Sequence, residues 1–133
     1  MLGAMAYAVA DCTLVIEEAG TIFRKGQPLD PWARRLIFMG RHSRINLIFL
    51  AQRANSIPID IRSQADRFVT FRQTEPEDVK AVGAVIGKNK QDLIPGLERL
   101  ECIDWQGGSV TSYKLQFGRA RQEQEIQDRK SNV

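Results

Sequence analysis

The chain has 133 residues, which suits one domain or one piece of a larger domain. Its composition, 43% hydrophobic and 26% charged, is typical of a soluble globular protein, and no apolar run is long enough to predict a membrane span. The single histidine, His42, excludes a His-rich metal site. Cys12 and Cys102 lie in or beside apolar runs, so we interpret them as buried free thiols of an intracellular protein.

The net charge of +3 is unevenly distributed along the chain. Between Arg24 and Arg53 there is one acid, Asp30, against seven basic residues, which are Arg24, Lys25, Arg34, Arg35, Arg41, Arg44 and Arg53. We call this stretch the basic field. It suits the phosphates of a nucleotide or of a nucleic acid, but a solvated helix face has the same charge pattern. Charge alone does not separate the two interpretations.

The N-terminal part predicts a helix, a strand and a loop. Residues 2–10 are apolar but follow no basic segment, so a buried helix is favoured over a signal peptide. Thr13–Glu17 is a short apolar run that predicts a buried strand. Ala19–Leu29 contains two glycines and a proline, which predicts a loop.

A helix is predicted next, because Asp30 is a good N-cap and Pro31 suits the first helical position. It should run to about His42, with an apolar stripe formed by Trp32, Leu36 and Met39. The apolar run Asn46–Ala51 then predicts a second buried strand.

The middle of the chain continues the alternation. A short helical turn is expected around Asp60–Ala65, and the alternating run Arg67–Arg72 predicts a third strand. Thr74–Glu77 has the pattern of a capping box, so a helix should follow and end at Gly87 in the left-handed conformation.

The C-terminal part has a different character. After a short helix over Lys90–Ile94, the runs Leu100–Trp105 and Ser109–Phe117 flank Gln106-Gly107-Gly108, which predicts a β-hairpin. The charged tail Arg119–Val133 predicts a frayed helix or a disordered segment. The order of elements predicts an α/β fold with a mostly parallel sheet and a C-terminal β-hairpin.

The first two predicted strands both stop at polar residues. The first is followed by Glu17 and Glu18, and the second by Gln52 and Arg53. Ligands of open α/β sheets bind at the carboxyl ends of strands, where carboxylates can hold a metal ion's water shell and orient an attacking water. Solvated surface charges at a loop are the alternative, and the acidic pair taken alone favours that alternative.

Two arginines precede the second strand. Arg41 or Arg44 could act as an arginine finger that reaches a nucleotide on a neighbouring subunit, where a fixed guanidinium neutralises developing charge. Cations are also favoured at a helix C-terminus without any catalytic role, and the two interpretations have equal weight for each arginine.

In their order and spacing, these elements resemble the FtsK–HerA group of P-loop ATPases, which pump DNA in cell division, repair, conjugation and viral packaging. The matching stretch runs from about Leu14 to Gly107. The motifs that carry the resemblance are Leu14–Glu18, Gly40-Arg41-His42, Ala51-Gln52-Arg53, Ile57–Arg62 with Ala65-Asp66, and Phe71-Arg72 followed by Glu75–Asp78. The family has Asp-Glu where this chain has Glu17-Glu18.

The resemblance implies a P-loop NTPase core of the ASCE type, with ATP and Mg²⁺ as cofactors. It implies that Glu17 is the Walker B acid holding Mg²⁺ through water, Glu18 the catalytic glutamate and Gln52 the sensor. Arg41 is the first choice for the finger and Arg44 the second. DNA is the implied partner, within a homo-oligomeric ring in the cytoplasm, or in the host cytoplasm if the protein is viral.

A phosphate-binding loop of the form G-x-x-x-x-G-K-[ST] is missing from the sequence. The nearest string, Gly83–Asn89, is one residue short and ends a predicted helix instead of opening one. In the family this loop lies upstream of the acidic strand. We therefore expect residues 1–118 to be the C-terminal part of an ATPase core, with 119–133 as a tail, and expect no ATP hydrolysis without the missing N-terminal half.

Two further functions stay open on the sequence. The chain could be a non-catalytic nucleic-acid-binding or interaction remnant that uses the basic field. It could also be part of a protein-secretion ATPase of the same superfamily, since the translocated polymer is usually decided by appended domains.

Overall fold

The computed structural model describes residues 10–116 and 119–122, with side chains described as far as residue 116. The chain divides into two compact units, residues 1–64 and 65–133, and each is described by itself. None of the helices in the described ranges is long and apolar enough to cross a membrane. The predicted helix over residues 2–10 lies almost entirely outside the described residues.

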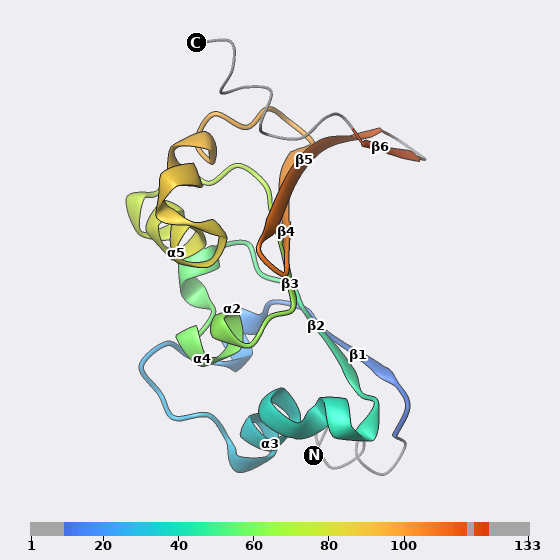
Figure 1. The fold of residues 1–133 in the computed structure, drawn as a ribbon. Coiled ribbons are helices and arrows are strands. Elements are labelled where there is room, and N and C mark those ends of the chain that lie inside the picture. The colour runs from blue at the N-terminus through green and yellow to red at the C-terminus, as the bar shows by residue number, and fades with distance from the viewer. Residues whose placement is uncertain (1–9, 117–118, 123–133) are drawn as a thin grey trace. The chain divides into compact units, whose positions relative to one another are not determined.

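The first unit is built on a parallel pair of strands. Strand β1 (Thr13–Ile16) pairs with β2 (Asn46–Phe49), with Thr13 opposite Asn46 and Ile16 opposite Phe49. The crossover between them contains α2 (Ala19–Ile22), α3 (Pro31–Met39) and the 3-10 turn η1 (Gly40–Ser43). After β2 come η2 (Ala54–Ser56) and α4 (Ile59–Ser63). Figure 1 shows this β-α-β arrangement, which the alternation of elements predicted.

Helix α3 begins where the sequence predicted. The Asp30 carboxylate accepts a hydrogen bond from the Trp32 amide at 2.9 Å, and Pro31 occupies the first turn. The side facing the strands forms a small core, in which Leu36 and Ile45 are buried and Cys12, Leu14 and Leu47 pack against them.

The predicted apolar stripe of α3 is wrong for two of its three members. Leu36 is buried, but Trp32 is 42% exposed and Met39 is 53% exposed. The buried or partly buried positions are instead Ala33, Leu36, Ile37 and Gly40. The apolar side chains that were predicted to be core therefore face solvent.

Both predicted strands of this unit end earlier than expected. β1 stops at Ile16 because Glu18 adopts a left-handed backbone conformation, which cannot continue a strand. The predicted loop Ala19–Leu29 is wrong at its start, where α2 forms one helical turn. A four-residue helix carries too little periodicity to be recognised from sequence.

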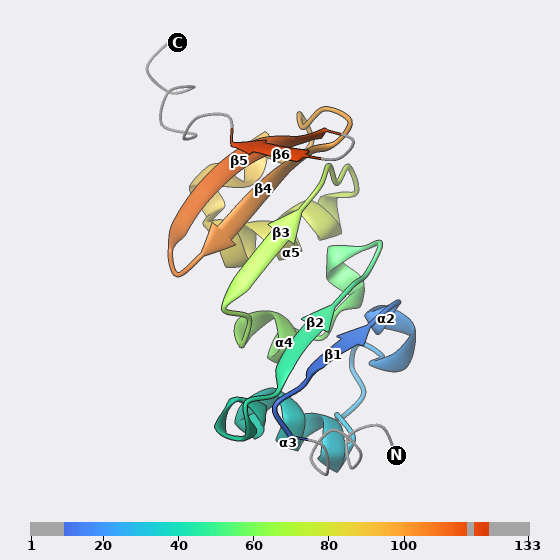
Figure 2. The same ribbon diagram turned by 90° about the vertical axis from the view of Figure 1, so that its right-hand side faces the viewer.

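The second unit is a four-stranded antiparallel sheet with helices. Its order is β3-β4-β5-β6, formed by Arg67–Thr70, Glu101–Gln106, Ser109–Gln116 and Arg119–Gln122. Helix α5 (Pro76–Ile86) and the 3-10 helix η3 (Lys88–Leu93) connect β3 to β4. Figure 2 shows the strands of this sheet side by side. Parallel pairing among the described residues is confined to β1 and β2, so the antiparallel share is larger than predicted.

The predicted hairpin joins β4 to β5 through Gly107 and Gly108. Both glycines have positive φ, at 55° and 90°, which a two-residue hairpin turn requires. Val82, Ile94, Cys102 and Ile103 are almost fully buried and form the core of this unit. The confirmed burial of the Cys102 thiol raises its pKa above the ordinary value, because burial disfavours the thiolate.

Two predictions for the second unit are wrong in detail. Helix α5 has Glu75, not Thr74, as its N-cap, with no side-chain cap hydrogen bond, because Pro76 fixes the first helical position two residues after Thr74. The tail was predicted as a frayed helix or disordered, but Arg119–Gln122 forms β6, with Arg119 opposite Gln116. Its pairing depends on the free edge of β5, which composition does not reveal. Residues 123–133 lie outside the described residues.

Candidate functional site

The carboxyl ends of β1 and β2 lie together, as the sequence predicted. The ladder continues past the strands, since the Leu50 amide donates to the Ile16 carbonyl and the Ala19 amide donates to the Leu50 carbonyl, both at 2.9 Å. The Gln52 amide Nε2 donates a hydrogen bond of 2.9 Å to Glu18 Oε1. Two polar residues that are 34 positions apart in sequence are thereby joined at one edge of the sheet.

Glu18 has an unusual backbone conformation for a residue with a side chain. Its φ of 50° and ψ of 46° lie in the left-handed region, which costs on the order of 1 kcal/mol or more outside glycine. The conformation is held by Thr21, whose amide and hydroxyl both donate to the Glu18 carbonyl at 2.8 Å. Strained residues of this kind are found at functional sites. Four other non-glycine residues in the described ranges also have a positive φ, so the conformation by itself does not mark Glu18 as functional.

The turn that carries Glu18 is packed against η2. A Cβ on Gly20 would lie only 2.6 Å from the Ser56 Cβ, so only glycine allows this approach. The Ser56 hydroxyl donates to the Arg53 carbonyl at 2.6 Å, and Lys25 Nζ donates to Asn55 Oδ1 at 2.8 Å. The sequence analysis did not predict that η2 packs against the turn of Glu18. The one feature of the sequence that pointed to this contact was the glycine two residues after Glu18.

Glu17 lies next to Glu18 with its side chain exposed to solvent. Mg²⁺ is usually held by one or two carboxylates together with substrate phosphates and water, and this pair supplies such a donor set. No group of three or more His, Cys, Asp or Glu residues that could form an all-protein cage is found within the described ranges. The residues therefore fit a hydrated Mg²⁺ shared with phosphate oxygens and do not fit a closed metal site.

The two candidate finger arginines lie at the other end of the strands. The Asp11 amide donates to the Ser43 carbonyl at 3.1 Å, which places η1, and with it Arg41, beside the start of β1. Arg44 has a φ of 52° and forms a 3.5 Å ion pair with Asp11. Four strand residues separate this end from the acidic end, a distance of roughly 13 Å. The structure thus joins Glu18 to Gln52 and places the backbone of Arg41 and Arg44 at the opposite end of the two strands.

Comparisons with known proteins give a clear structural likeness and no sequence match. No family model and no curated protein matches the chain. The chain resembles the genome-packaging NTPase B204 of Sulfolobus turreted icosahedral virus 2 in its complex with ATP-γS. The sequence identity is 19% and the TM-score 0.74, over 84% of this chain. The same protein with AMPPCP gives a TM-score of 0.75, over 85% of this chain.

A second similar structure is B204, the DNA-packaging ATPase of Sulfolobus turreted icosahedral virus. It is 22% identical, with a TM-score of 0.73 over 85% of this chain. These likenesses confirm the fold predicted from the resemblance to packaging-type P-loop ATPases. In each case the chain spans 56% of the length of the neighbour.

Proposed function

We propose that this chain supplies the acidic and sensing part of an ATP-driven motor that packages or translocates DNA. The observation that carries the proposal is the hydrogen bond from Gln52 to Glu18, which joins the ends of two neighbouring parallel strands. An apolar strand ending in two acids is common by itself. An acid linked to a neutral amide on the next strand places a general base beside a group that can orient an attacking water, which suits nucleotide hydrolysis.

In this proposal Glu18 orients and deprotonates the attacking water. Gln52 donates to one carboxylate oxygen of Glu18, so the other oxygen is left to accept a proton from water. Gln52 reports the state of the γ-phosphate, because its amide is neutral and can bond either to Glu18 or to the phosphate. Glu17 holds the water shell of Mg²⁺, which supplies charge neutralisation to the phosphates when ATP is bound.

The phosphate-binding loop would come from a separate or additional segment of polypeptide. The chain covers 56% of the B204 structures, which are bound to ATP-γS or AMPPCP. The B204 proteins package viral genomes, which favours DNA as the translocated polymer over a secreted protein. Because Arg41 and Arg44 follow α3 at the strand end opposite Glu18, either would act on the nucleotide of a neighbouring subunit in a ring.

The test is to restore the missing segment and measure hydrolysis. A strand, a G-x-x-x-x-G-K-[ST] loop and a helix from a packaging NTPase are fused upstream of the chain, and DNA-stimulated ATP hydrolysis is measured. Glu18→Gln keeps an oxygen acceptor for Gln52 but removes the base, so kcat should fall by about 100-fold or more. Glu77→Gln, an exposed acid on α5, is the matched control and should leave kcat unchanged.

Two results would contradict the proposal. One is the absence of hydrolysis in a fusion that is folded and binds ATP. The other is hydrolysis that Glu18→Gln does not reduce.

The alternative is a nucleic-acid-binding module that uses the basic field. The observation in its favour is that α3 carries two exposed arginines and no acid. It predicts DNA binding by the chain alone, weakened by salt and by the combined substitution Arg34→Ala, Arg35→Ala and Arg41→Ala.

A further inference from the structure

The turns that follow the two strands of the candidate site carry the same pair of hydrogen bonds. After β1, the Thr21 amide and hydroxyl both donate to the Glu18 carbonyl at 2.8 Å. After β2, the Ser56 amide and hydroxyl both donate to the Arg53 carbonyl, at 3.2 Å and 2.6 Å. Arg53 directly follows Gln52 in the sequence. Each of the two residues that bond across the strand ends is therefore held by a turn that a hydroxyl side chain closes.

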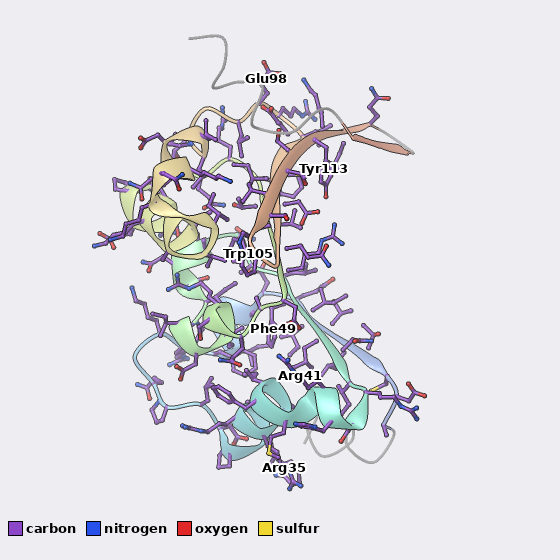
Figure 3. The ribbon with its side chains drawn as sticks, in the orientation of Figure 1. Arg35, Arg41, Phe49, Glu98, Trp105 and Tyr113 are labelled. Atoms are coloured by element: carbon purple, nitrogen blue, oxygen red, sulfur yellow. The ribbon has the colours of Figure 1, made fainter. Side chains whose placement is uncertain are left out.

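Helix α2 is fixed on β2 at both of its ends. The Ala19 amide at its start donates to the Leu50 carbonyl at 2.9 Å. At its end, the Phe23 ring meets the ring of Phe49 (Figure 3) edge-on, with the ring centres 5.9 Å apart. Thr21 lies between these two contacts, so its hydrogen bonds tie the preceding residues to a helix that is itself docked on the strands.

The two turns also contact one another. Gly20 packs so closely on the second turn that a Cβ at this position would lie 2.6 Å from the Ser56 Cβ. Lys25 Nζ, in the loop after α2, donates to Asn55 Oδ1 of η2 at 2.8 Å. The two turns therefore form one packed cluster, which fixes the backbone on both sides of the hydrogen bond that joins the strand ends.

We propose that Thr21 and Ser56 are positioning residues, which hold the Glu18 carboxylate and the Gln52 amide in the geometry that hydrolysis uses. The inference rests on the proposed function. The backbone of Glu18 lies in the left-handed region, and its side chain would point in another direction if the backbone relaxed to the extended region. A glutamate side chain has large rotamer freedom, so a carboxylate on a loosely held backbone samples many positions. The two hydroxyls thus determine where the general base points.

The type of hydrogen bond alone carries no function, because hydroxyl side chains often donate to a carbonyl three residues earlier. Ser63 makes the same bond to the Asp60 carbonyl on α4, at 3.2 Å. The bonds from Thr21 and Ser56 differ from it in their acceptors, which lie at or next to the two residues that join the strand ends. Ser63→Ala is therefore the matched control, since it removes the same kind of bond from a turn that holds no candidate site residue.

The first measurement uses the full chain without nucleotide. The side-chain amide of Gln52 is hydrogen-bonded to Glu18, so its NMR signal should shift as the pH is lowered and Glu18 takes up a proton. Glu18→Gln should abolish this shift, which identifies its source. Thr21→Val keeps the shape of the side chain and removes the hydroxyl. It should reduce the shift to about half or less, because one hydrogen bond contributes about as much as the left-handed conformation costs.

Three further variants complete the NMR measurement. Ser56→Ala should reduce the Gln52 shift in the same way as Thr21→Val. Thr21→Ser keeps the hydroxyl and should show the full shift, as should Ser63→Ala. Circular dichroism verifies that each variant is folded.

The second measurement uses the fusion that restores the phosphate-binding loop. Thr21→Val and Ser56→Ala should each lower kcat by about tenfold and leave the KM for ATP unchanged, since a misplaced base slows the chemical step without removing contacts to the nucleotide. Thr21→Ser should restore kcat, and Ser63→Ala should leave it unchanged. A purely structural role of the hydroxyls predicts lower stability but the same kcat for the folded enzyme.

Three results would overturn the positioning role. The first is a Gln52 signal that does not follow the protonation of Glu18, and the second is a Gln52 shift that Thr21→Val and Ser56→Ala leave intact. The third is an active fusion whose kcat neither substitution lowers. Failure of the proposed function has a different signature. The fusion would then be inactive, or insensitive to Glu18→Gln, while the Gln52 shift still responded to the two hydroxyl substitutions.

Discussion

The two units of the chain differ in how completely they bury their own apolar surface. Among residues 65–116 of the second unit, three large hydrophobic residues are exposed, which are Val69, Phe71 and Leu100. In the described part of the first unit there are eight, which are Val15, Ile22, Trp32, Phe38, Met39, Ile48, Leu50 and Ile59. The first unit contains the candidate site, so the poorly buried surface and the chemistry occur in the same unit.

The difference follows from the type of sheet. An antiparallel sheet with one helical layer can leave its other face to solvent, as the second unit does. A parallel sheet is normally covered on both faces and rarely has as few as two strands. Val15 and Ile48 lie on the face of β1 and β2 that α3 does not cover. The first unit thus leaves more large apolar side chains exposed than the second, which supports the proposal that further polypeptide packs on it.

The largest expected effect is in the core of the second unit. Ile103 is 1% exposed, so Ile103→Ala should lower the free energy of unfolding by about 2–5 kcal/mol, through lost burial and a cavity. Ile48 is 45% exposed, and Ile48→Ala should cost less than about 1 kcal/mol. In urea unfolding, the fluorescence of Trp105 reports on the second unit and that of Trp32 reports on the first. Equal losses of stability for the two variants would contradict the difference in burial between the units.

A smaller effect is expected where the turn of Glu18 packs on η2. Gly20→Ala would force its new methyl group into the Ser56 side chain, and it should destabilise the first unit by about 1–3 kcal/mol. Adding Ser56→Gly should restore most of the loss. Gly40→Ala, in the same unit, is the control, because its Cβ would lie 3.7 Å from the nearest atom. Trp32 fluorescence during urea unfolding gives the measurement, and a neutral Gly20→Ala would show that the contact does not constrain the turn.

The smallest effect is a pH dependence in the second unit. Arg67 Nε donates to Asp104 Oδ1 at 3.0 Å, and this hydrogen bond, with the attraction between the charges, holds the pKa of Asp104 below its ordinary value. A lowered carboxyl pKa stabilises the fold above the unfolded pKa of about 3.9, and this stability is lost as the pH falls through the folded pKa. Asp104→Asn should therefore cost about 1 kcal/mol near neutral pH.

The cost of Asp104→Asn should shrink as the pH is lowered below about 4. Urea unfolding at pH 7 and pH 3 measures it, and Asp60→Asn, an exposed acid of the first unit, is the control. A cost that is the same at both pH values would exclude the ion pair with Arg67 as its source.

Much of the local structure could be predicted from the sequence, because it depends on neighbouring residues. The Asp30 cap and the Gly107-Gly108 turn were both placed correctly, since each is a backbone requirement that a particular residue meets. The pairing of Arg119–Gln122 with β5 was missed, because a strand of that composition forms only where another strand offers an unpaired edge. The exposed side of α3 was also missed, since periodicity gives the stripe but not the direction in which it points.

The candidate site divides in the same way. The sequence by itself determined that two apolar strands are each followed within three residues by a polar side chain, Glu18 and Gln52, because polarity along the chain is a local property. The tertiary structure alone decided that these two side chains bond at 2.9 Å and that Glu18 is held in a left-handed conformation. It also decided that Arg41 and Arg44 lie at the opposite end of the strands. The distances between these side chains depend on the register of β1 against β2, and that register is set only when the crossover through α3 is folded.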